Sequence, residues 1–137
     1  MIQKLQTRRG GFTLVEIMIV VAIIALLAAS AVPNFLRARK RSQATRILED
    51  LRILDSATDQ YAIENNKTSL AAANFTDLKN YIKTGTVLYA TGQDIFGDSY
   101  GASGGLFTVD QLPTIPSNAW VTLSDVAPQS FWSPYHN

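Results

Sequence analysis

The chain contains no cysteine and only one histidine among its 137 residues. The absence of cysteine excludes disulfides, thiol nucleophiles and thiolate metal sites, so the distal loops must be held by packing or by an ion. The histidine, His136, is the second-last residue, and the sequence has no G-x-S-x-G motif, Walker loop or cluster of metal ligands. We therefore do not expect an enzyme.

A long uncharged run is the most prominent feature that is present. Residues 17–36 carry no charge, and a helix of about 20 apolar residues is long enough to cross the ~30 Å hydrocarbon core of a bilayer. The run therefore predicts a membrane span. Lys4, Arg8 and Arg9 precede it, and the positive-inside rule predicts that this end stays in the cytoplasm while the rest points outward.

The start of the apolar run has two unusual features. Glu16 lies at the edge of the uncharged run, directly before residue 17. A charge there costs less than the roughly 2.5–3.5 kcal/mol expected near the centre of a span, but the charged side chain still needs a partner. Gly10 and Gly11 come shortly before it. Such a dipeptide can lie extended and allow close approach by another protein, as a protease site at a membrane surface requires.

The sequence GFTLVE at residues 11–16, after a cationic leader and before an apolar helix, resembles the class III signal of type IV pilins and type II secretion pseudopilins. The resemblance implies that a prepilin peptidase cuts between Gly11 and Phe12 and methylates the new N-terminal Phe12. It implies that Glu16 pairs with the terminal amine of a neighbouring subunit in a filament. The alternative is that Glu16 pairs with the amine of its own chain or is stabilised by its own helix N-terminus. It also implies an assembly ATPase, an inner-membrane platform protein and other minor pilins as partners.

The apolar periodicity continues beyond the span and predicts one helix over residues 13–65. Pro33 interrupts it and lacks a backbone donor, so we expect a kink there; the resemblance adds local melting before Pro33 in some filaments. On the charged faces, the spacing of Arg46 with Asp50 and of Arg52 with Asp55 predicts two ion pairs. The apolar stripe consists of Ala44, Ile47, Leu48, Leu51, Leu54, Ala57 or Thr58, and Tyr61.

The expected architecture is α+β and pilin-like, with a long kinked helix packed on a small antiparallel sheet. Its parts are a leader (residues 1–11), the membrane half of the helix (12–36), its amphipathic half (37–65) and a small α+β head (66–137). Within the head, the patterns predict a short helix over residues 74–83 and strands over residues 86–90, 106–110 and 120–123.

The end of the head is rich in aromatic residues. Phe131, Trp132 and Tyr135 lie within five residues, and we expect them to form the last layer of the core. An exposed aromatic patch that contacts a partner or another subunit is the alternative.

Residues 94–100, with the sequence DIFGDSY, resemble the DPWGNPY loop of the type II secretion major pseudopilin, although both prolines are missing. That pseudopilin binds calcium in a distal loop. Asp94, Asp98, Asp110 and Asp125 are accordingly candidate calcium ligands. No EF-hand spacing is present, so we favour solvated turn aspartates and expect no cofactor.

The overall charge of +1 hides an asymmetry, since residues 1–52 sum to +6 and residues 53–137 to −5. The basic cluster between Arg37 and Arg52 raises the alternative of a DNA-uptake pilin. We favour contact with lipid headgroups, and later with acidic residues of a neighbouring subunit, because the exposed head is acidic. Nucleic acid is therefore not an expected partner.

The favoured interpretation is a non-enzymatic, single-pass precursor in the bacterial inner membrane, with its head periplasmic or extracellular. Surrounded by lipid before assembly, it would then form a homo-oligomeric filament, either a type II secretion pseudopilus or a type IV pilus. An alternative starts from Ala29-Ser30-Ala31, which is an acceptable cleavage site of an ordinary secretory signal. Cleavage after Ala31 would release a soluble protein instead.

Overall fold

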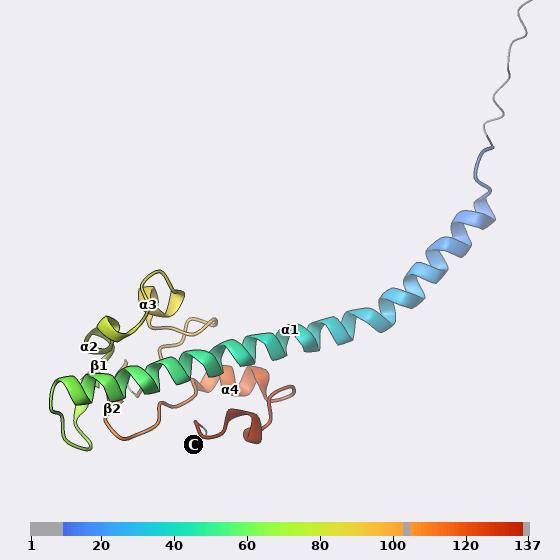
Figure 1. The fold of residues 1–137 in the computed structure, drawn as a ribbon. Coiled ribbons are helices and arrows are strands. Elements are labelled where there is room, and N and C mark those ends of the chain that lie inside the picture. The colour runs from blue at the N-terminus through green and yellow to red at the C-terminus, as the bar shows by residue number, and fades with distance from the viewer. Residues whose placement is uncertain (1–9, 103–104, 136–137) are drawn as a thin grey trace, which may run out of the picture. The chain divides into compact units, whose positions relative to one another are not determined.

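The computed structural model describes residues 10–102 and 105–135, so most of the leader lies outside the described residues (Figure 1). The chain divides into two units, residues 1–36 and 37–137. Helix α1 (Leu14–Glu64) contributes to both units. The other elements are β1 (Ala72–Asn74), α2 (Phe75–Leu78), the 3-10 helix η1 (Lys79–Tyr81), α3 (Val87–Thr91), β2 (Leu106–Thr108), α4 (Ser117–Leu123) and the 3-10 helix η2 (Gln129–Trp132).

Helix α1 confirms the predicted long helix to within one residue at each end. It stops because Asn66 adopts a left-handed conformation, with φ of 49°. The Lys67 amide then donates to the Ala62 carbonyl at 2.9 Å, which is the bond that closes a Schellman motif. Asparagine tolerates this conformation better than most residues with side chains, so the stop is encoded locally.

Pro33 lies inside α1, and the helix continues on both sides of it. The Ser30 hydroxyl donates to the Leu27 carbonyl at 2.9 Å, and the Asn34 side-chain amide donates to the Ser30 carbonyl at 3.2 Å. Side-chain bonds of this kind accompany bends and supply donors to backbone carbonyls near a proline. The kink and the local melting stay predictions.

The apolar stripe of α1 forms one side of the core of the head, as predicted. Its residues are buried, and Tyr61 packs against the cluster as a partly buried side chain. The remainder of the core comes from the rest of the head, including Leu78, Tyr100, Phe107 and Trp132. An isolated amphipathic helix is only marginally stable in water, so the second part of α1 owes most of its stability to the packing of this stripe.

The two predicted ion pairs along α1 are wrong. Asp50 instead accepts a hydrogen bond from the Tyr100 hydroxyl at 3.0 Å, and Asp55 accepts one from the Tyr135 hydroxyl at 3.3 Å. Among the described residues, the ion pair that forms is Lys40 with Asp125. Exposed pairs within a helix contribute only a few tenths of a kcal/mol, so contacts made by the packed head prevail.

The head contains one antiparallel pair of strands, β1 and β2, with Ala73 opposite Phe107. Strand β2 confirms the start of the strand predicted over residues 106–110; its backbone pairing continues to Val109, and Asp110 has a positive φ of 63°. The sequence analysis missed β1, whose residues, two alanines and an asparagine, have low strand propensity. A long helix on a small antiparallel sheet confirms the α+β class.

The strands predicted over residues 86–90 and 120–123 are wrong, because both segments are helical. In α3, the Thr86 hydroxyl caps the helix by accepting from the Tyr89 amide at 3.1 Å, and Gly92 ends it with a left-handed φ of 65°. In α4, the buried residues Ala119 and Leu123 lie four residues apart, the spacing of one helix face.

The helix predicted over residues 74–83 forms as two short pieces, α2 and η1, after the capping residue Asn74. The closing aromatic residues pack into the core, as predicted. Trp132 is fully buried, and its indole N–H donates to the Ala127 carbonyl at 3.0 Å. Tyr135 is also buried and Phe131 partly so, which disfavours the alternative of an exposed patch.

Two adjacent residues of α1 allow a matched test of this core. Leu54 is fully buried, whereas Ile53 is 41% exposed. We expect Leu54→Ala to lower the free energy of unfolding of the head by about 2–5 kcal/mol, because it removes packed methyl groups and leaves a cavity. Ile53→Ala should change it by only about 0.5 kcal/mol. Chemical denaturation of the full chain in detergent checks this, and equal losses in the two variants would contradict the assignment of the core.

The pH dependence of stability tests the bond between Tyr100 and Asp50. Burial raises the pKa of Asp50, and the hydrogen bond from Tyr100 only partly offsets it. A raised pKa in the folded state means that stability is highest below the ordinary value of 3.8 and falls as pH rises through the raised value. Asp50→Asn, whose amide oxygen still accepts from Tyr100, should therefore stabilise the head slightly at pH 7, by about 0.5 kcal/mol at this partly exposed site.

The gain in stability should vanish near pH 3.5, where the Asp50 carboxyl of wild type is protonated and therefore as neutral as the amide of the variant. Thermal unfolding of both proteins across pH measures the gain. If Asp50→Asn were less stable at pH 7, with a deficit that grows as pH rises, the ionised carboxylate would be the stabilising form and our assignment would be wrong.

Candidate functional site at the start of the long helix

The peptide bond predicted for cleavage lies in an open part of the chain. Gly10, Gly11 and Phe12 precede α1, and all three are exposed. No atom lies within 4 Å of the position that a Cβ would take on either glycine. An enzyme can therefore reach the backbone between Gly11 and Phe12 from several sides without displacing any other described segment.

Helix α1 begins with a capping box formed by Thr13 and Glu16. The Thr13 hydroxyl accepts from the Glu16 amide at 3.2 Å, and Glu16 Oε2 accepts from the Thr13 amide at 3.4 Å. This reciprocal pair satisfies two backbone donors that a helix start otherwise leaves free. The sequence signal was present, as threonine followed three residues later by glutamate, but the sequence analysis did not use it.

The capping box explains how Glu16 is accommodated within one chain. Its carboxylate lies in the first turn of α1, where the helix dipole favours negative charge by about 0.3–1 kcal/mol. An ionised carboxylate can accept about four hydrogen bonds, and one to Glu16 is formed within the described part of the chain. Glu16 therefore keeps room for a further donor, such as an ammonium group.

The helix that follows this site presents apolar side chains on every face. From Phe12 to Leu36 the large apolar side chains are each at least half exposed. Helix α1 is long and apolar enough to cross a membrane, and no residue in its most apolar stretch is buried. This surface must be covered by something other than the described part of the same chain, either lipid or other protein.

The four aspartates considered as calcium ligands are not brought together. Asp94 is buried in a turn, where its Oδ1 accepts from the amides of Phe96 and Asp98 at 2.8 and 2.9 Å. Asp125 pairs with Lys40, and Asp110 lines a separate hollow beside Asp55 and Asp59. Across residues 10–102 and 105–135, no group of three histidine or acidic side chains could hold a metal ion.

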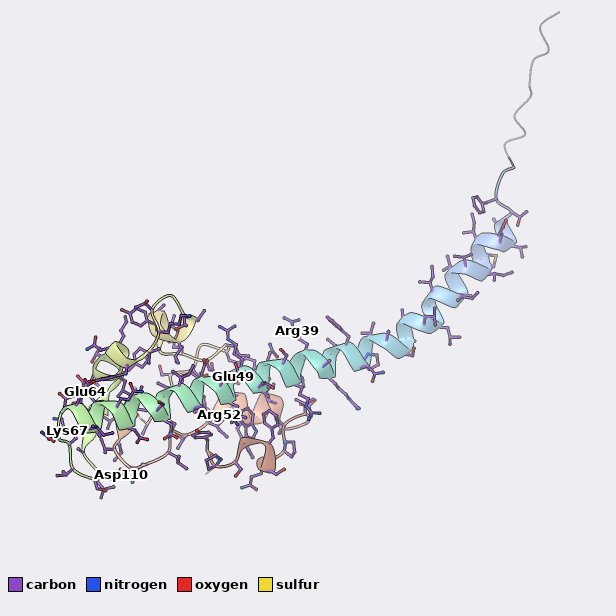
Figure 2. All side chains as sticks on the ribbon, in the orientation of Figure 1. Arg39, Glu49, Arg52, Glu64, Lys67 and Asp110 are labelled. Atoms are coloured by element: carbon purple, nitrogen blue, oxygen red, sulfur yellow. The ribbon has the colours of Figure 1, made fainter. Side chains whose placement is uncertain are left out.

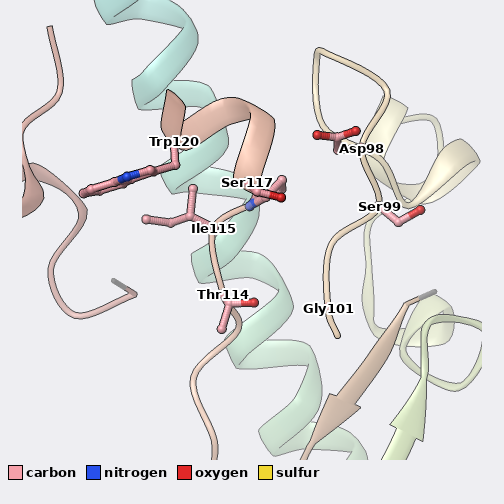
Figure 3. A pocket seen from close by; sticks show the side chains of 8 residues that line it. Asp98, Ser99, Gly101, Thr114, Ile115, Ser117 and Trp120 are labelled. Atoms are coloured by element: carbon pink, nitrogen blue, oxygen red, sulfur yellow. The ribbon is translucent and has the colours of Figure 1, made fainter. Parts of the chain in front are cut away.

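A hollow of about 600 Å³ lies between the loop of residues 98–101 and the segment that leads into α4. Figure 3 shows Asp98 on one wall and Thr114 and Ser117 on the other. Its lining consists of Asp98, Ser99, Gly101, Thr114, Ile115, Pro116, Ser117 and Trp120. The polar side chains of this lining are the carboxylate of Asp98 and the hydroxyls of Ser99, Thr114 and Ser117.

Comparison with known proteins places the similarity at this end of the chain. Residues 6–32 match the family model described as the prokaryotic N-terminal methylation motif. The type II secretion system core protein G of Aeromonas hydrophila is 35% identical over 60 residues, which are 44% of this chain and 42% of that protein. No solved structure matches the chain.

Type IV pilins are similar over a stretch of comparable length. The type IV wide pilus major component of Thermus thermophilus is 48% identical over 64 residues, covering 46% of this chain and 49% of that protein. The type IV major pilin of Myxococcus xanthus is 40% identical over 68 residues, covering 50% of this chain and 31% of that protein.

The chain thus matches less than half of the length of these relatives. The match includes Gly11, Phe12, Glu16 and the apolar part of α1. Residues 6–32 carry the prokaryotic N-terminal methylation motif, and 44–50% of the chain is similar to type II secretion system core protein G and to type IV pilins.

Proposed function

We propose that this chain is the precursor of a filament subunit, which is cut after Gly11, methylated on Phe12 and polymerised through the first half of α1. One observation carries the proposal: an uncovered apolar helix begins directly at the methylation motif, with Glu16 in its first turn. The names of the relatives, core proteins of a secretion system and pilins, support a structural rather than an enzymatic role.

The exposed apolar surface provides the driving force for assembly. In the membrane, lipid covers the side chains of residues 12–36. In a filament, copies of the same helix packed side by side would cover the same area. Removing apolar surface from water is favourable by about 25 cal/mol per Å². A subunit can therefore leave the bilayer only if neighbouring helices replace the lipid, and this couples extraction to polymerisation.

Glu16 would set the position of each added subunit. Cleavage after Gly11 creates an amine on Phe12, with an ordinary pKa near 8, so it is charged at neutral pH. In an apolar bundle, a charged amine and a carboxylate are both costly unless they meet. We infer that the amine of one subunit pairs with Glu16 of its neighbour, which replaces the weak bond that Glu16 makes to Thr13 in the single chain.

The proposal implies a place and a set of partners. The chain would sit in the bacterial inner membrane with the leader in the cytoplasm and the head outside it. A prepilin peptidase, an assembly ATPase, a platform protein and minor subunits would act on it or join it. Since the chain is similar both to core protein G and to a type IV pilin, the filament would be either a type II secretion pseudopilus or a type IV pilus.

Processing gives the first test. The mature chain purified from cells that contain a prepilin peptidase should begin at Phe12 and carry one added methyl group on its terminal nitrogen. Intact mass and N-terminal peptide mass measure this directly. Gly11→Val should block cleavage. The backbone at Gly11 is open in the structure, and a branched side chain there would obstruct the close approach of the peptidase. A mature chain that begins at Val32 would instead support the secretory signal and contradict the proposal.

Glu16→Gln gives a sharper test of the assembly step. Glutamine can replace glutamate in a capping box, so the start of α1 and insertion into the membrane should be preserved. The charge that meets the Phe12 amine is lost, and breaking a buried ion pair costs about 3–5 kcal/mol. We expect filament yield, measured by shearing and sedimentation, to fall by about a hundredfold or more.

Thr13→Ala serves as the matched control for this test. It removes the hydroxyl half of the capping box and costs about 1 kcal/mol at the helix start, but it leaves the carboxylate of Glu16 in place. Filament yield should therefore fall far less than in Glu16→Gln. Equal yields from wild type and Glu16→Gln would show that the carboxylate is not needed for assembly.

A further inference from the structure

Four cationic residues follow the last apolar residue of the predicted span and form a collar on α1. The collar, as we define it, consists of Arg37, Arg39, Lys40 and Arg41. At 3.6 residues per turn, Arg37 and Arg41 lie on one side of the helix and Arg39 on the opposite side. The five residues from 37 to 41 extend about 6 Å along the axis, so the charges surround the helix at one level.

The head itself neutralises one member of this collar. Lys40 Nζ lies 2.9 Å from Asp125 Oδ2, and the bond from Lys40 is the main reason that the pKa of Asp125 is lowered, with a smaller contribution from Arg37. Arg37, Arg39 and Arg41 are exposed and form no ion pair with another described residue. Figure 2 shows Arg39 projecting from α1 away from the packed head.

The distribution of these charges distinguishes between two kinds of partner. A protein that docks on α1 would contact one face and would leave the opposite cation without a partner. A layer that encircles the helix contacts all of them at once. The headgroup layer of a bilayer is such a layer, about 5–7 Å thick on each side, which matches the axial extent of the collar.

We propose that Arg37, Arg39 and Arg41 bind the headgroups of anionic phospholipids and so fix how deeply α1 sits in the membrane before assembly. This inference rests on the proposed insertion of α1. A guanidinium group donates two parallel hydrogen bonds to a phosphate. Each basic residue near an anionic membrane surface strengthens binding to that surface by a factor of about five. Asp125 holds Lys40 out of this contact and ties the loop after α4 to the level of the collar.

The experiment uses the full chain in vesicles of phosphatidylcholine alone and in an equal mixture with phosphatidylglycerol. After gentle extraction into detergent, mass spectrometry measures the ratio of the two lipids that remain bound. Wild type should retain phosphatidylglycerol several-fold above its share in the mixture, and raising the salt concentration should reduce this excess. The triple variant Arg37→Gln, Arg39→Gln and Arg41→Gln should lose most of this excess. The part that remains would come from the leader cations Lys4, Arg8 and Arg9 at the other membrane surface.

The matched control removes three charges elsewhere, with Arg46→Gln, Arg52→Gln and Lys67→Gln, all at exposed positions. It should retain lipid as wild type does. Asp125→Asn, which frees Lys40, should increase the excess of phosphatidylglycerol, a gain that a merely structural role of the collar would not produce.

The inference is overturned if wild type retains the two lipids in the proportion of the mixture, or if the triple variant keeps the excess. Insertion is scored separately, as resistance of the chain to alkaline extraction from pure phosphatidylcholine vesicles. Normal insertion without lipid preference overturns the collar alone. Failure of wild type to insert overturns both the collar and the membrane step of the proposed function.

Discussion

The uncovered apolar surface of residues 12–36 is the constraint on which the rest of the molecule depends. Fifteen large apolar side chains in this stretch are at least half exposed, and fully burying each one is worth about 1.5–3 kcal/mol. Their sum, tens of kcal/mol, exceeds the net stability of a typical domain. No rearrangement of so small a head could supply this cover, so the environment of the helix, lipid or neighbouring helices, decides where the chain can exist.

The head is built so that it need not change when this environment changes. Its buried core begins at Ala44 on α1 and is completed by residues between 57 and 135. None of residues 12–36 belongs to that core. The same helix therefore carries an apolar surface on all faces in its first part and a single buried stripe in its second. Under the proposed function, a subunit of this design would exchange lipid for protein around residues 12–36 while the packing of the head stays intact.

The sequence was sufficient where a regular period ran over many residues, as it did along α1. The short elements of the head were harder, because α3 and α4 depend on Thr86, Gly92 and the spacing of Ala119 and Leu123 rather than on strand propensity. The hydrogen bond of Asp50 joins it to a residue 50 positions later in the chain, and that of Asp55 to a residue 80 positions later. No local sequence pattern reveals such contacts. The capping box was readable from the sequence, because Thr13 is followed three residues later by Glu16.

Under the proposed function, the two partners of Glu16, the Thr13 amide and the amine of a neighbouring subunit, explain why cleavage would act as a switch. In the uncut chain, the nitrogen of Phe12 belongs to a neutral amide, and the bond from Thr13 to Glu16 is a weak capping interaction of about 1 kcal/mol. That is enough to help the carboxylate enter the edge of the membrane, yet too little to hold it in the centre of a helical bundle. Only a cut after Gly11 supplies a charged amine as a stronger partner. Under the proposed function, an uncut subunit would bury an unpaired charge on joining a filament, so assembly would have to wait for cleavage.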